Sequence, residues 1–211
     1  MKVFIVHADE HWVLVDKPAG LPSVPGRKPE LHDCAASRVQ ALYEDARVVH
    51  RLDMATSGLL VFARGAEHQR TLGLAFEKRR IDKRYVAIVQ GVVAADTGSI
   101  DLPLIVDWPN RPRQIVDHTI GKPSLTHWRV LARGRDWTRL ELQPVTGRSH
   151  QLRVHLASIG HAIVGDDLYA PPEAATRTPR LMLHARALEL PHPQTGERVR
   201  FETPVPFDDL P

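Results

Sequence analysis

Alternation of apolar and polar positions predicts strands along most of the chain. The segment Val13–Pro18 is predicted to be a short strand that ends at the proline, and Gly58–Arg64 is a longer one that follows a tight break. In the segment Lys83–Val93, every second residue belongs to the same face of a strand. The same pattern predicts four further strands, over Thr126–Ala132, Thr138–Gln143, Arg186–Leu190 and Arg198–Glu202.

Helical spacing is confined to three segments. Asp33 is a candidate N-cap for a helix over Cys34–Glu44, in which Val39 and Leu42 recur on one face. The other two helices are expected over Glu67–Arg80, with Leu72, Ala75 and Phe76 inward, and over Ser149–Ile159, with Leu152, Leu156 and Ile159 on one face. Strands therefore outnumber helices and do not alternate strictly with them, which favours an α+β fold over a parallel doubly wound one.

Length and composition are those of an ordinary folded domain. The 211 residues are 43% hydrophobic and 25% charged, enough for one substantial core or two closely joined halves, and we expect a single domain over 1–211. Cys34 is the one cysteine, which excludes an intrachain disulfide and fits a reducing compartment. The apolar N-terminal run is too short for a signal peptide, and no later run is long enough for a membrane span. We expect a cytoplasmic protein without a membrane partner.

The net charge of +3 is unevenly distributed. Seven basic and three acidic residues lie between Arg64 and Arg84. Two smaller basic clusters contain Arg111 with Arg113, and Arg148 with Arg153. Such patches fit a phosphate backbone, although the first could equally be a solvated helix face.

Three groups of residues could support chemistry. Asp53 follows Arg51 between apolar residues, where a carboxylate is a candidate nucleophile or base, or one half of a structural ion pair. Tyr85 follows Lys83 and Arg84 on a strand, where a phenol could stack on a base or transfer a proton, or belong to the core. The third group is the segment Thr146–His155, in which Arg153 shares a helix face with His150.

Other chemistries have weaker support. His150 and His155 lack the spacing of a His-Glu-x-x-His zinc site, and a turn or helix cap explains Asp166-Asp167 as well as a metal does. We predict no metal. Ser57 and Ser149 would allow a hydrolase in principle, but no Gly-x-Ser-x-Gly motif is present. Neither glycine-rich nucleotide-binding motif occurs.

Six segments in order resemble the RluA-type family of RNA pseudouridine synthases. They span most of the chain and comprise Asp16–Leu21, His50–Gly58, Lys83–Gly91, Thr146–His155, Gly165–Tyr169 and Leu183–Ala185. The resemblance implies a pseudouridine synthase fold, with a mixed, largely antiparallel sheet, flanking helices and a central catalytic cleft. It also implies that no cofactor is needed, because the isomerisation involves neither a redox step nor group transfer.

The resemblance assigns roles residue by residue. Asp53 matches the catalytic aspartate, Tyr85 the active-site tyrosine and Arg153 the basic residue that pairs with the aspartate. Arg51 matches the arginine that helps to flip the target uridine. We expect further RNA contacts from six residues in or near the basic clusters, namely His50, Lys83, Arg84, Arg111, Arg113 and Arg148.

The match is nearest to the short branch of the family, whose substrates are large-subunit ribosomal RNA and tRNA anticodon stem-loops. About a dozen residues precede the first core strand, so we expect no N-terminal S4 RNA-binding domain. We also expect a monomer. The alternatives are a non-catalytic RNA-binding protein that retains the fold and, with less support, a serine or metal hydrolase.

Overall fold

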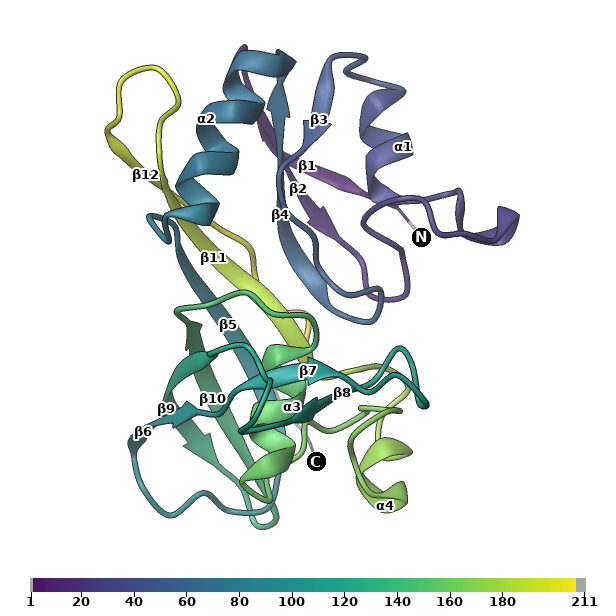
Figure 1. Cartoon of the computed structure of the whole chain (residues 1–211), viewed down its shortest axis with the longest axis vertical. Helices are drawn as coiled ribbons and strands as arrows, with labels where there is room; N and C mark the ends of the chain where they lie inside the picture. Colours follow the sequence, from purple (N-terminus) through teal and green to yellow (C-terminus); the bar gives the residue numbers. More distant parts are fainter. Residues whose placement is uncertain (1, 208–211) are drawn as a thin grey trace. The chain divides into compact units, whose positions relative to one another are not determined.

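The computed structural model describes residues 2–207 and divides into two compact units. The first unit contains the chain up to Lys83 together with the segment from His184 onward, and the second is Arg84–Leu183. Strands predominate and most pairs are antiparallel, which confirms the predicted α+β class with a mixed, largely antiparallel sheet. Figure 1 shows the elements of each unit.

In the first unit, the strands follow the order β1-β2-β4-β11. β2 (Trp12–Lys17) pairs antiparallel with both β1 (Phe4–Ala8) and β4 (Ser57–Arg64), while β11 (Leu183–Pro191) runs parallel to β4. At the margins, β3 (Ala46–Val48) pairs with β4, and β12 (Arg198–Glu202) pairs with β11. β2 and β4 are buried along nearly their whole length, as expected for strands covered on both faces.

An apolar cluster forms part of the core of the first unit. Trp12 and Leu14 of β2 meet Leu59 and Val61 of β4, and α2 (Gly65–Glu77) adds Leu72 and Ala75. In Figure 1, α2 covers β4. The shorter elements α1 (Ala35–Gln40) and η1 (Pro29–Leu31) precede β3. This packing makes β4 a rigid support for the loop that precedes it.

In the second unit, the strands follow the order β5-β10-β9-β6 and all neighbours are antiparallel. Their bounds are Asp82–Gln90 for β5, Trp137–Pro144 for β10, Leu125–Arg133 for β9 and Thr97–Asp101 for β6. β10 alternates strictly between buried and half-buried residues, so one face of this sheet packs on the core.

A small hairpin and two helices complete the second unit. β7 (Leu104–Val106) and β8 (Gln114–Val116) form a separate two-stranded hairpin, and α3 (Gln151–Ser158) lies near β8 and β10. α4 (Pro172–Ala175) is a single turn. α3 is buried over its first six residues, so the side chains on most of its surface face protein.

Two of the predicted helices differ from the structure in detail. The first helix is shorter than expected, its N-cap is Cys34 instead of Asp33, and Leu42 is 69% exposed. Asp33 instead forms an exposed ion pair with Arg38. Ile159 is also exposed, because it follows the last turn of α3. Within residues 2–207, no helix is long and apolar enough to cross a membrane.

Candidate active site

Asp53 lies in the loop between β3 and β4, and the residues around it are held by hydrogen bonds. The buried hydroxyl of Ser23 donates to the carbonyl oxygen of Leu52 (2.7 Å) and accepts from the Leu52 amide (3.0 Å). The Gly20 amide donates to the carbonyl of Met54 (2.8 Å). Both neighbours of Asp53 are therefore fixed through their backbone, while the Asp53 side chain is half-buried.

Lys17 is a buried cation beneath the same loop. Its Nζ donates to the carbonyl oxygens of Leu21 (2.8 Å), Pro18 (3.0 Å) and Met54 (3.1 Å). These bonds join the segment that follows β2 to the segment that contains Asp53. A buried ammonium is costly unless such acceptors surround it, so Lys17 constrains the path of both segments. No role for Lys17 was predicted from the sequence, although it lies in one of the matching segments.

Gly58 marks the point where β4 begins its pairing with β11. Its φ of +113° is outside the range that other residues adopt readily. A Cβ atom here would lie 2.3 Å from the carbonyl oxygen of Ala185 on β11. Only glycine therefore permits this close approach of two parallel strands, directly after the loop that carries Asp53.

Ser57 and His184 form a pair at the same register. Ser57 Oγ lies 2.8 Å from His184 Nδ1, and His184 Nε2 lies 3.0 Å from Thr203 Oγ1. All three side chains are buried, and the third partner is a hydroxyl where a hydrolase would have a carboxylate. The pair cross-links β4, β11 and the segment after β12, and it gives no support to the serine hydrolase alternative.

His50 contacts protein on both its ring face and its edge. The ring stacks on Phe76 of α2 with centroids 4.5 Å apart, and Nε2 accepts the amide proton of Val61 (3.0 Å). Burial, reinforced by the nearby charge of Lys83, lowers the pKa of His50 to about 3. The imidazole is therefore neutral at physiological pH and fixes the start of the loop, whereas Arg51 is exposed.

The two basic residues at the start of β5 differ in environment. Burial lowers the pKa of Lys83 to about 8. Arg84 Nη1 donates to Gln143 Oε1 (2.7 Å) and lies 3.9 Å from Glu141 of β10. Tyr85 follows on the same strand, half-buried and paired in register with Leu142. Arg84 is thus partly engaged by the protein itself.

Arg153 is buried on α3 and bound to an acidic residue that was not predicted to be its partner. Its Nε and Nη2 donate to the two carboxylate oxygens of Asp166 (2.8 and 2.6 Å), and Nη2 also donates to Asp167 (3.1 Å). Asp166 additionally accepts the amide protons of Leu168 and Tyr169. The turn interpretation of Asp166-Asp167 is therefore correct, and the buried ion pair is new. The pairing of Arg153 with Asp53 stays a prediction.

The remaining predicted RNA contacts are exposed. Arg111 lies over the ring of Trp108, 4.7 Å from its centroid, in the turn of the β7–β8 hairpin. Arg113 lies over the ring of Tyr169 (5.5 Å), and Arg148 precedes α3. The second unit thus brings Arg113 and Arg153 to one tyrosine, and the first unit brings Lys83 near His50.

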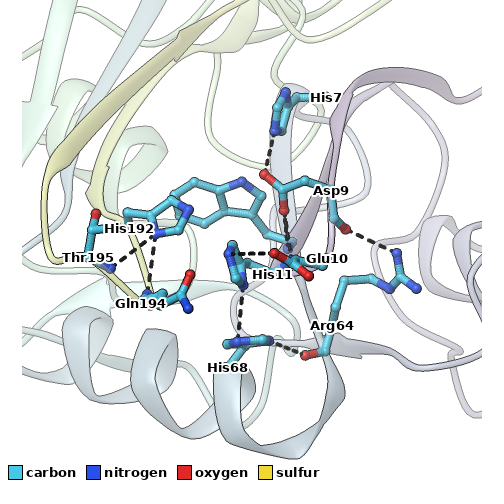
Figure 2. Close-up of polar contacts among 10 residues, drawn as sticks. His7, Asp9, Glu10, His11, Arg64, His68, His192, Gln194 and Thr195 are labelled. Carbon is cyan, nitrogen blue, oxygen red and sulfur yellow. Dashed lines mark hydrogen bonds and ion pairs between the residues drawn. The ribbon is translucent and has the colours of Figure 1, made fainter.

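Four histidines of the first unit have ring contacts with other side chains or with the backbone (Figure 2), namely His7, His11, His68 and His192. His68 Nδ1 donates to the carbonyl of Arg64 (2.7 Å), so its Nε2 can accept from His11 Nδ1 (3.2 Å). His7 lies 2.8 Å from Asp9, and His192 packs edge-on against His11. Among residues 2–207, no three His, Cys, Asp or Glu side chains are arranged to hold a metal ion.

Comparison with known proteins identifies the class to which this fold and loop belong. Residues 11–158 match the family described as RNA pseudouridylate synthase, and the chain belongs to that family of isomerases. It is similar to the dual-specificity RNA pseudouridine synthases RluA of Pasteurella multocida (49% identity, over 96% of this chain and 93% of the relative) and Escherichia coli K12 (48%, with the same coverage). The predicted resemblance to the RluA-type family is thereby confirmed.

Solved structures agree. Human RNA pseudouridylate synthase domain containing 1 matches with a TM-score of 0.83 and 29% identity, over 98% of this chain and 84% of that one. Human RNA pseudouridylate synthase domain containing 4 gives a TM-score of 0.79 and 25% identity, over 96% and 88%. The predicted fold is confirmed by these neighbours.

Proposed function

We propose that this protein isomerises uridines in structured RNA to pseudouridine and that Asp53 is the nucleophile or base. The observation that carries the assignment is the anchoring of its loop. Leu52 and Met54 are bound through their backbones to Ser23 and Lys17, and the carboxylate between them is half-buried. A catalytic group held in this way needs little reorganisation when the substrate binds.

The reaction balances without a cofactor. The bond between C1′ and N1 breaks, the uracil turns, and a bond forms between C1′ and C5. The C5 carbon then loses its proton, while N1 gains one. A carboxylate beside the ribose can attack C1′ or remove the proton of C2′, and both routes use Asp53 in its ionised form.

The other roles follow the family resemblance. We propose that Arg153 is the basic residue that pairs with Asp53, as the family resemblance implies. Tyr85 would stack on the uracil and help to remove its C5 proton. Arg51, which is exposed, would occupy the space that the flipped uridine leaves in the RNA.

The proposed substrates are loops of large-subunit ribosomal RNA and the tRNA anticodon stem-loop. The target base must leave its stack before it reaches Asp53, at a cost of a few kcal/mol that is smaller in a loop than in a duplex. Relatives at 48–49% identity are named dual-specificity RNA pseudouridine synthases, which supports more than one substrate. The basic residues Lys83, Arg84, Arg111, Arg113 and Arg148 would bind the phosphates, and His50 would shape the loop.

The test compares Asp53→Asn with Asp33→Asn, which removes only an exposed carboxylate paired with Arg38. We expect Asp53→Asn to abolish pseudouridine formation while the circular dichroism spectrum and RNA affinity remain those of the wild type. Asp33→Asn should retain activity. Turnover by Asp53→Asn would refute the assignment of the nucleophile or base. If the Asp53→Asn protein complements a synthase-null strain, the non-catalytic RNA-binding alternative is favoured. Mapping of pseudouridine with and without the gene identifies the substrates.

A further inference from the structure

Tyr169 lies at a junction of three segments in the second unit. Its hydroxyl accepts the amide proton of Gln114 at the start of β8 (2.7 Å). The same hydroxyl lies 2.7 Å from Nδ1 of His150, the residue before α3. Because a phenol has one proton and two lone pairs, it can accept from the amide and still donate to a neutral imidazole. One oxygen atom therefore joins the β7–β8 hairpin to the beginning of α3.

The ring of Tyr169 contacts two guanidinium groups. Arg153 lies 5.2 Å from the ring centroid, and Arg113 lies 5.5 Å from it. Both distances are within the range of cation–π attraction. Arg153 is the proposed partner of the catalytic aspartate, and Arg113 is a predicted RNA contact, so the ring serves both.

The backbone around Tyr169 is fixed by the carboxylate that binds Arg153. Asp166 accepts the Tyr169 amide proton (3.1 Å) and binds Arg153 through both of its oxygens. His150, on the other side of the hydroxyl, has a φ of +54°, a left-handed conformation that costs a non-glycine residue free energy unless its surroundings compensate. The contact of its ring with Tyr169 helps to hold His150 in that backbone conformation.

We propose that Tyr169 is a positioning residue for RNA binding, whose hydroxyl holds the base of the β7–β8 hairpin so that Arg111 and Arg113 are presented to the substrate. The proposal rests on the proposed function. The turn of the hairpin exposes Trp108 (64% exposed) and Arg111, which lies over its ring. The hairpin itself has only three residues in each strand, so contacts at its base decide how rigidly it presents these groups.

The test uses Tyr169→Phe, which removes the hydroxyl and keeps the ring between the two arginines. We expect KM for an RNA stem-loop substrate, and Kd for the same RNA, to rise about tenfold, the effect of losing roughly one net hydrogen bond, with kcat within about twofold of the wild type. Tyr43→Phe is the matched control, because that tyrosine contacts Arg64 through its ring. It should leave Kd and KM unchanged.

Two further variants separate positioning from general stability. Gln114→Pro deletes the amide that donates to the hydroxyl. The Kd of the Gln114→Pro, Tyr169→Phe double variant should therefore be no higher than the higher Kd of the two single variants, because both remove the same hydrogen bond. In an Arg111→Ala, Arg113→Ala background, Tyr169→Phe should no longer change Kd. An unchanged Kd in Tyr169→Phe overturns the proposal, and so does the same tenfold change when Arg111 and Arg113 are both alanine. Kd is measured without turnover, so absence of catalysis in the wild type would refute the proposed function alone.

Discussion

Lys17 Nζ donates a hydrogen bond to the carbonyl oxygen of Met54, the residue that follows Asp53. The same ammonium binds Pro18 and Leu21, so a buried charge at the end of β2 organises the loop before β4. The candidate catalytic carboxylate is thus supported by a cation that contacts its backbone neighbourhood.

Lys17→Met should therefore destabilise the fold and the loop together. The carbonyls of Pro18 and Leu21 lose their donor, while the carbonyl of Met54 keeps the Gly20 amide. Each buried unsatisfied group costs about 1–3 kcal/mol, so we expect a loss of several kcal/mol in the free energy of unfolding. Urea denaturation measures it. Lys122→Met, at an exposed position, is the control and should change stability by less than about 0.5 kcal/mol. Equal midpoints for the two variants would contradict the assignment.

Asp166 and Asp167 offer a matched pair. Asp166→Asn should weaken the charged partner of a buried guanidinium and cost up to about 3–5 kcal/mol, whereas Asp167→Asn should cost at most about 1 kcal/mol. The reason is exposure: the Asp166 side chain is fully buried and that of Asp167 is 81% exposed. Thermal unfolding of the two variants in one buffer tests the difference, and similar melting temperatures would count against it.

Two glycines with positive φ separate steric contact from backbone strain. Gly58→Ala would place a methyl group against the carbonyl of Ala185, while Gly65→Ala meets nothing within 4 Å. We expect Gly65→Ala to cost about 1–2 kcal/mol from conformation alone and Gly58→Ala to cost clearly more. Chemical denaturation provides both values. A smaller loss for Gly58→Ala would show that β4 and β11 can separate without penalty.

The low pKa of His50 makes stability depend on pH. The folded state resists protonation down to about pH 3, while the unfolded chain binds the proton near pH 6.5. The contribution of neutral His50 to the free energy of unfolding is thus fully present above pH 6.5. It falls as the pH drops from 6.5 towards 3, by at most about 1.4 kcal/mol per pH unit. His50→Gln removes this contribution. The unfolding free energies of the wild type and His50→Gln should therefore converge as the pH falls from 7 to 4.5, and parallel profiles of the two proteins would refute the expectation.

RNA affinity should respond to Lys83 at the other end of the pH scale. Its pKa of about 8 means that the charge is present at pH 7 and is lost as the pH rises through 8. Filter binding of an RNA stem-loop should therefore show weaker affinity at pH 9 than at pH 7. Lys83→Arg keeps its charge throughout and should bind equally at both values. A pH-independent wild type would exclude Lys83 as a phosphate contact.

The strands with clear alternation or long apolar runs were predictable from the sequence. β2, β4, β9, β10 and β12 lie within one or two residues of their predicted bounds. The three-residue strands β3, β7 and β8 were not predicted, because so short a segment has no measurable period. Cys34 replaced Asp33 as the N-cap since the thiol and Ser37 form a reciprocal pair, which ordinary cap preferences do not anticipate.

The site was predictable only in part, for a related reason. Asp53 and Tyr85 stand in recognisable segments, but the bonds of Lys17 to Met54 and of Arg153 to Asp166 join segments that are apart in the chain. Arg153 and Asp166 are thirteen residues apart and meet through the turn after Gly165. Such contacts depend on tertiary structure, so no local spacing indicates them.

The cap of α1 also has a practical consequence. Cys34 is the single cysteine of the chain, and its thiol is buried against Ser37. A thiol reagent therefore reacts only with molecules in which the start of α1 has opened. The rate of labelling, followed against denaturant concentration, would report the free energy of that local opening in the natural sequence, with no introduced probe.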